Sequence, residues 1–127
     1  MDLYSNTIIV SKALAEKNPK AVKGFIRALN RGLKDSYNDR DAAVKAVLKR
    51  EPLLKPEIER ERLDLMFSFD MSAPEVKKNG VGDVTDERLK RNIEIVVDAN
   101  NLPRTPKPSE VFNRSFLPPA SERLKPM

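Results

Sequence analysis

The chain has 127 residues, of which 39% are hydrophobic and 34% are charged, and its net charge is +5. It contains no cysteine and no histidine, which excludes disulfides, thiol nucleophiles, most zinc sites and the commonest general base. This length suffices for one domain with a modest core. Basic and acidic residues alternate, as in residues 55–62, so we expect solvated helix faces and no nucleic-acid partner. We find no bilayer-spanning stretch and no secretory signal.

The first predicted element is a short strand at residues 7–10, which are apolar and mostly β-branched. No later stretch resembles a strand that could pair with it. Its backbone N–H and C=O groups therefore need another edge, either from a second copy or from another part of a larger protein. Tyr4, Ser5 and Asn6 stand at its beginning. They are either an ordinary polar lead-in or ligand contacts, because strand ends in α/β sheets are common binding sites.

Helical patterns dominate the chain up to residue 102. A short helix at residues 11–17 ends at Asn18, which caps the next helix together with Pro19. That helix, residues 19–37, has apolar residues at three- and four-residue spacing and should form the centre of the core. Its interior glycines, Gly24 and Gly32, each cost about 1 kcal/mol relative to alanine. We therefore expect another backbone to approach them closely.

Three more helices are predicted, at residues 42–50, 56–70 and 86–100. The second half of the helix at 56–70 is apolar nearly all round and should be buried. Residues 72–83 should form a loop, and Thr85 should cap the helix that follows it. We thus predict one body at residues 1–102 and a proline-rich tail at residues 103–127. The tail should contain one helical turn near residues 110–113, lie strapped over the body and fray after Pro119.

Few polar clusters in the chain suggest chemistry. The sequence Gly80-Val81-Gly82 before a helix resembles a phosphate-binding loop, but it lacks the remaining motif residues, and a tight turn explains it better. Ser68 and Asp70 are better explained as partners of nearby backbone groups, and the glutamates of residues 57–61 as a solvated face. No serine lies in a nucleophile elbow. We therefore expect no catalytic residue, no metal site and no cofactor, so the chain should not be an enzyme.

Three stretches carry a resemblance to a known family, and they occur in its usual order over most of the chain. They are LYSNTIIVSKALAEKNPKAVKGFIRALNRGLKDSYND, APEVKKNGVGDVTDERLKRNIEIV and PSEVFNRSFLPPASERL. Together they resemble the C-terminal part of an ABC-importer substrate-binding protein with the type II periplasmic binding protein fold. The branch is the one that covers nitrate, sulfonate, taurine and thiamine-pyrimidine-precursor binders.

The resemblance implies a predominantly α chain of about five helices plus one N-terminal strand, forming the C-terminal portion of a two-lobed α/β fold. The strand would be the return crossing between the lobes, which places Tyr4, Ser5 and Asn6 near a cleft for a small anionic or heteroaromatic solute. It also implies a membrane permease as partner, a periplasmic location, and a fragment that lacks the first parts of both lobes. The alternative is a stand-alone helical module for protein interaction or self-association.

Overall fold

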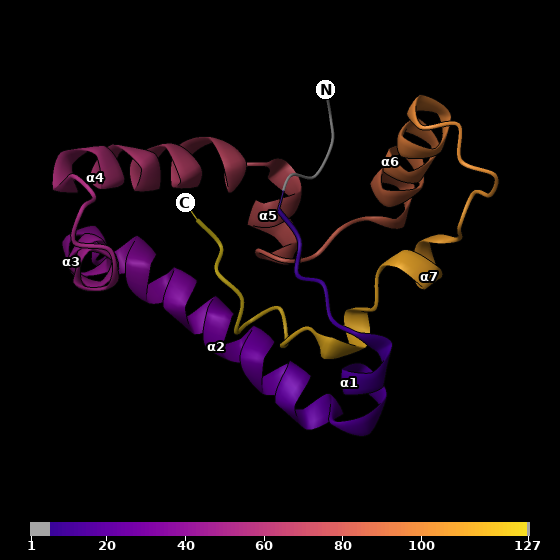
Figure 1. Cartoon of the computed structure of the whole chain (residues 1–127), viewed down its shortest axis with the longest axis horizontal. Coiled ribbons are helices and arrows are strands. Elements are labelled where there is room, and N and C mark those ends of the chain that lie inside the picture. The colour runs from indigo at the N-terminus through magenta and orange to yellow at the C-terminus, as the bar shows by residue number, and fades with distance from the viewer. Residues whose placement is uncertain (1–5, 127) are drawn as a thin grey trace.

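The computed structural model describes residues 6–126 and is shown in Figure 1. Within this range the chain forms seven α-helices, one π-helical segment and one 3-10 segment. They are α1 (Lys12–Lys17), α2 (Pro19–Asn38), α3 (Arg40–Arg50), α4 (Pro56–Leu65), η1 (Met66–Asp70, π), α5 (Pro74–Asn79), α6 (Asp86–Ala99), α7 (Pro108–Val111) and η2 (Arg114–Phe116, 3-10). The prediction of a predominantly helical chain is confirmed.

Side-chain caps fix where the main helices begin. The side chain of Asn18 accepts a hydrogen bond from the Ala21 N–H at 3.2 Å, and Pro19 occupies the first position of α2. The side chain of Thr85 accepts from the Arg88 N–H at 3.3 Å at the start of α6. Each cap satisfies a backbone N–H that has no partner inside its helix. Both predicted caps are therefore present.

The predicted strand is wrong for the residues that the structure describes. Residues 7–10 adopt no regular structure, and their backbone groups bond to no other residue in the range 6–126. Ile8 and Ile9 are 47% and 88% exposed. A strand is stable only beside another edge, and no strand forms elsewhere in this range. The β-branched residues 7–10 favour an extended strand, but no neighbouring strand in the described range pairs with them.

The segment at residues 56–83 also differs from the prediction. The expected single helix continues as α4 only to Leu65 and then widens into the π-helical η1. In η1, Phe67 is buried and its ring meets that of Tyr37 edge-on, with centroids 5.1 Å apart. Phe69 is 73% exposed, so only one side of this apolar stretch is covered. The expected loop contains α5, which begins at Pro74 and carries Glu75 in its first turn.

The helices form an open arrangement with a thin core. In Figure 1, α2 and α4 diverge from α3, which contacts both, and α6 lies at the far side. No described side chain is fully enclosed. The buried hydrophobic residues among those described are Val22, Val44, Phe67, Leu89, Ile93 and Leu124. The accessible surface is 9543 Å², whereas a compact monomer of this mass would expose about 6,800 Å². The chain thus leaves much apolar surface uncovered.

Helix α2 does not lie at the centre of a core, contrary to the prediction. Val22 is buried, but Phe25 is 58% exposed and Leu29 is 39% exposed. A Cβ atom built on Gly24 or Gly32 would have no neighbour within 4 Å outside its own helix. The expected close approach of another backbone to these glycines is therefore absent from the described structure. One side of the α2 apolar stripe faces the body and the other faces solvent.

The tail returns along α2 (Figure 1). It contacts both α2 and the turn between α5 and α6. Near its end, the Glu122 carboxylate accepts a hydrogen bond from Arg27 Nε on α2 at 2.8 Å. Arg123 Nη1 donates to Asp83 Oδ2, between α5 and α6, at 2.9 Å. These contacts lie beyond Pro119, where we expected the chain to fray. The end of the tail therefore ties α2 to the turn before α6.

The tightest packing occurs where the tail meets this turn. The Val81 N–H donates to the Leu124 carbonyl oxygen at 2.8 Å. Gly80 has a φ of +79°, and a Cβ atom added to it would lie 2.7 Å from the Arg123 Cβ. Only glycine combines this backbone conformation with so close an approach. We refer to residues 80–83 together with Arg114, Arg123 and Leu124 as the C-terminal clamp.

Candidate solute-binding segment

The three residues predicted to contact a solute lie at the beginning of the chain. Tyr4 and Ser5 fall outside the described residues. Asn6 is described and exposed, and it makes no hydrogen bond to another described residue. The chain then runs through residues 7–10 to Ser11, whose hydroxyl accepts from the Leu14 N–H at 3.2 Å and caps α1. The candidate segment is thus tied to the body at its C-terminal end, through α1 and α2.

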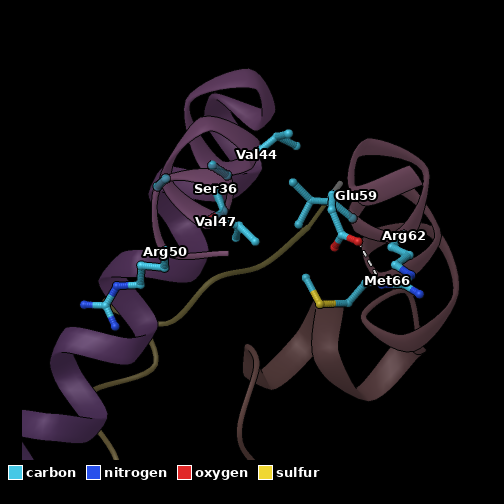
Figure 2. Close-up of a pocket in the computed structure, with 10 residues that line it drawn as sticks. Ser36, Val44, Val47, Arg50, Glu59, Arg62 and Met66 are labelled. Carbon is cyan, nitrogen blue, oxygen red and sulfur yellow. Dashed lines mark hydrogen bonds and ion pairs between the residues drawn. The ribbon is translucent and has the colours of Figure 1, made fainter. Parts of the chain in front are cut away.

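A hollow of about 470 Å³ lies between α3 and α4, away from this segment. Figure 2 shows Val44 and Val47 on one side of it and Met66 on the other. Three charged residues line it. Arg62 Nη1 donates to Glu59 Oε1 at 2.8 Å, whereas Arg50 forms no ion pair with another described residue. The hollow could hold an apolar group.

A second hollow, of about 570 Å³, lies beside α7. Two cations line it, Lys107 and Arg114. Arg114 donates to Asp83 at 3.2 Å and pairs with Asp86 at 2.7 Å. The Arg114 guanidinium also lies 5.4 Å from the centroid of the Phe112 ring. Partial desolvation lowers the pKa of Arg114, but the bonds to Asp86 and Asp83 outweigh this effect and raise it. An anion that binds Arg114 would have to compete with two carboxylates.

The turn that resembles a phosphate-binding loop is occupied by the chain itself. A phosphate would need free backbone N–H groups at the turn, but the Val81 N–H already bonds to Leu124. Burial would raise the pKa of Asp83, yet hydrogen bonds from Arg123, the Val84 N–H and Arg114 prevail and lower it. A fixed negative charge at the turn disfavours a phosphate. The structure agrees with the simpler interpretation of a tight turn.

Comparison with known proteins gives one match. The family model described as NMT1/THI5 like matches residues 1–43. The matched part includes Tyr4, Ser5 and Asn6, residues 7–10, α1, α2 and the start of α3. It supports the family of nitrate, sulfonate and thiamine-precursor binding proteins, whose members are binding proteins rather than typical enzymes. No curated protein and no solved structure matches the chain.

Among the described residues, 6–126, no helix combines the length and the hydrophobicity needed to cross a bilayer.

Proposed function

We propose that this chain is part of the solute-binding component of an ABC-type importer. In this proposal, Tyr4, Ser5 and Asn6 contribute to one wall of a cleft for a small anionic or heteroaromatic solute. The observation that carries the proposal is the family match over residues 1–43, because it includes all three candidate residues. The chain would act without catalysis, deliver its solute to a membrane permease and work in the periplasm.

The open architecture fits a chain that forms only part of a receptor. The described apolar side chains Ile8 and Ile9, next to the candidate residues, are exposed. In a complete receptor these side chains would be covered by the sheet from which residues 7–10 are separated. The proposed fragment therefore lacks the first parts of both lobes, and the other wall of the cleft would come from them.

A ligand screen tests the proposal. Nitrate, taurine and other sulfonates, pyrimidines and aromatic acids would be added to the chain, and to the chain joined to any coding sequence that precedes it. A bound solute at about 100 times its Kd stabilises the protein by about 2.7 kcal/mol, which raises the thermal midpoint. Failure of every solute to shift the midpoint of either protein would contradict a receptor function.

Variants then test the assigned residues. Ser5→Ala and Asn6→Ala should weaken binding of the solute that the screen identifies, because each removes a polar group from the cleft. Ser121→Ala is the matched control, since Ser121 is exposed in the tail and hydrogen-bonds to no described residue. Equal affinity of all three variants for the solute would remove Ser5 and Asn6 from the site.

A second function is favoured by a different observation. The exposed apolar side chains of α2 and residues 8–9 suit a helical module that binds protein instead of a small molecule. Gene context discriminates between the two functions. A neighbouring permease and ATPase gene, or upstream coding sequence for the missing lobes, supports the receptor. Their absence would favour the interaction module.

A further inference from the structure

Helix α2 carries most of the net positive charge of the chain. It contains five basic residues and one acidic residue, so it contributes +4 to the net charge of +5. The basic residues recur at three- and four-residue spacing, which keeps them in one row along a helix: Lys20, Lys23, Arg27, Arg31 and Lys34. We refer to these five residues as the basic row. The row is roughly 20 Å long at the rise of a helix.

The charge of the basic row is only partly compensated within the described residues. Arg27 pairs with Glu122 at 2.8 Å and Arg31 with Asp35 at 3.9 Å, yet the two arginine side chains are 64% and 84% exposed. The other members form no ion pair with another described residue: Lys20, Lys23 and Lys34. A row of cations with so few counter-charges attracts an anionic partner.

Exposed apolar side chains lie beside the basic row on the outer side of α2. Phe25 is 58% exposed and Leu29 is 39% exposed. Successive residues are about 100° apart around a helix axis, so Gly24 and Ala28 lie between the basic row and these two side chains. Gly24 has open space around it, since an added Cβ atom would meet nothing within 4 Å. The outer side of α2 therefore presents cations along one flank and large apolar groups along the other.

We propose that α2 binds along the surface of an anionic lipid membrane, with its axis parallel to that surface. The basic row contacts the lipid phosphates, while Phe25 and Leu29 enter the boundary between headgroups and acyl chains. This combination of cations and apolar side chains is typical of helices that lie in the membrane interface. In Figure 1, α2 runs along one edge of the molecule with no other helix beyond it, so a flat surface can reach it.

The apolar flank favours a membrane over nucleic acid as the anionic partner. Both present phosphates to the basic row. Only the membrane also offers an apolar layer that would cover Phe25 and Leu29. The proposal requires no membrane-spanning helix, and it does not depend on whether the chain binds a solute.

Vesicle cosedimentation with the full chain tests the charge part of the proposal. The chain should bind vesicles of equimolar phosphatidylglycerol and phosphatidylcholine, less tightly as salt increases, and should bind phosphatidylcholine vesicles far less. Lys20→Gln combined with Lys23→Gln should weaken binding about 30-fold, because a lysine near an anionic surface contributes about five-fold in affinity. Lys45→Gln combined with Lys49→Gln is the matched control. It removes the same charge from exposed positions on α3 and should have a much smaller effect.

Tryptophan fluorescence tests the apolar part. Since the chain has no tryptophan, Phe25→Trp introduces a single reporter, whose emission should shift to shorter wavelength with the anionic vesicles. Phe69→Trp is the control, because Phe69 is 73% exposed but lies on η1, and its emission should not shift. Absence of binding, equal losses in the two lysine double variants or equal shifts at the two positions would overturn the proposal. Tighter binding to a DNA duplex, without a shift at position 25, would overturn it in favour of nucleic acid.

Discussion

The C-terminal clamp and the outer face of α2 both contain glycines, yet their surroundings are opposite. At the clamp, Gly80 has a positive φ and lies against Arg123, so a side chain has no room. On α2, Gly24 and Gly32 have ordinary helical backbones and open space around them. The clamp is a completed contact within the chain. The outer face of α2 carries apolar residues of the kind that form packing contacts, but no described residue packs against it.

This comparison shows where the chain is self-sufficient. The clamp is formed by residues distant in sequence, since Arg114 and Arg123 both pair with Asp83. The α2 face is uncovered although its residues have the stronger apolar pattern. A strong local pattern therefore does not guarantee burial, because burial needs a second surface, which residues 6–126 do not supply here.

The largest expected effect comes from Gly80→Ala. The substitution places a Cβ atom where the φ of +79° strains it and within 2.7 Å of the Arg123 Cβ. We expect the free energy of unfolding to fall by about 3 kcal/mol, measured by urea denaturation. Gly82→Ala is the control, since its added Cβ would lie 3.7 Å from Leu117 and it carries only the backbone strain. A smaller loss at Gly80 than at Gly82 would contradict the clamp.

Next in size is Asp83→Asn, which removes the charge that Arg123 and Arg114 share. The Arg123 side chain is only 9% exposed, so it would lose its counter-ion in a poorly hydrated place. We expect a loss of about 2 kcal/mol in the free energy of unfolding at neutral pH. Asp70→Asn, in an exposed position without an ion pair to a described residue, should change it little. Equal losses in the two variants would show that the Asp83 carboxylate stabilises the fold no more than an exposed, unpaired carboxylate does.

The same carboxylate predicts a pH dependence. Because the pKa of Asp83 is lowered in the folded chain from its usual 3.8, its contribution to stability is fully present above that value. It is lost as the pH falls through the depressed folded pKa. Acid titration of the unfolding midpoint should therefore show a steeper loss below about pH 4 for the unmodified chain than for Asp83→Asn. Parallel curves would contradict the lowered pKa.

The sequence predicted correctly the features that depend on residues close together in the chain, and failed for those that depend on residues far apart in it. The caps at Asn18 and Thr85 were correct because capping involves residues only three apart. The strand at residues 7–10 was wrong because pairing depends on a distant edge. The clamp could not be foreseen, since its ion pairs join residues that no local pattern connects. Of the candidate site, Asn6 is exposed as a ligand contact requires, while Tyr4 and Ser5 lie outside the described residues.

The smallest expected effect has the opposite sign to the first. Gly24→Ala replaces a helical glycine whose added methyl meets nothing within 4 Å, so it should raise the free energy of unfolding by about 1 kcal/mol, the difference in helix propensity. Urea denaturation at low protein concentration measures this without contribution from association. The same substitution would thus destabilise the chain at Gly80 and stabilise it at Gly24. If Gly24→Ala destabilised the chain instead, a backbone must approach α2 closely in solution, and its outer face would already be covered within one copy.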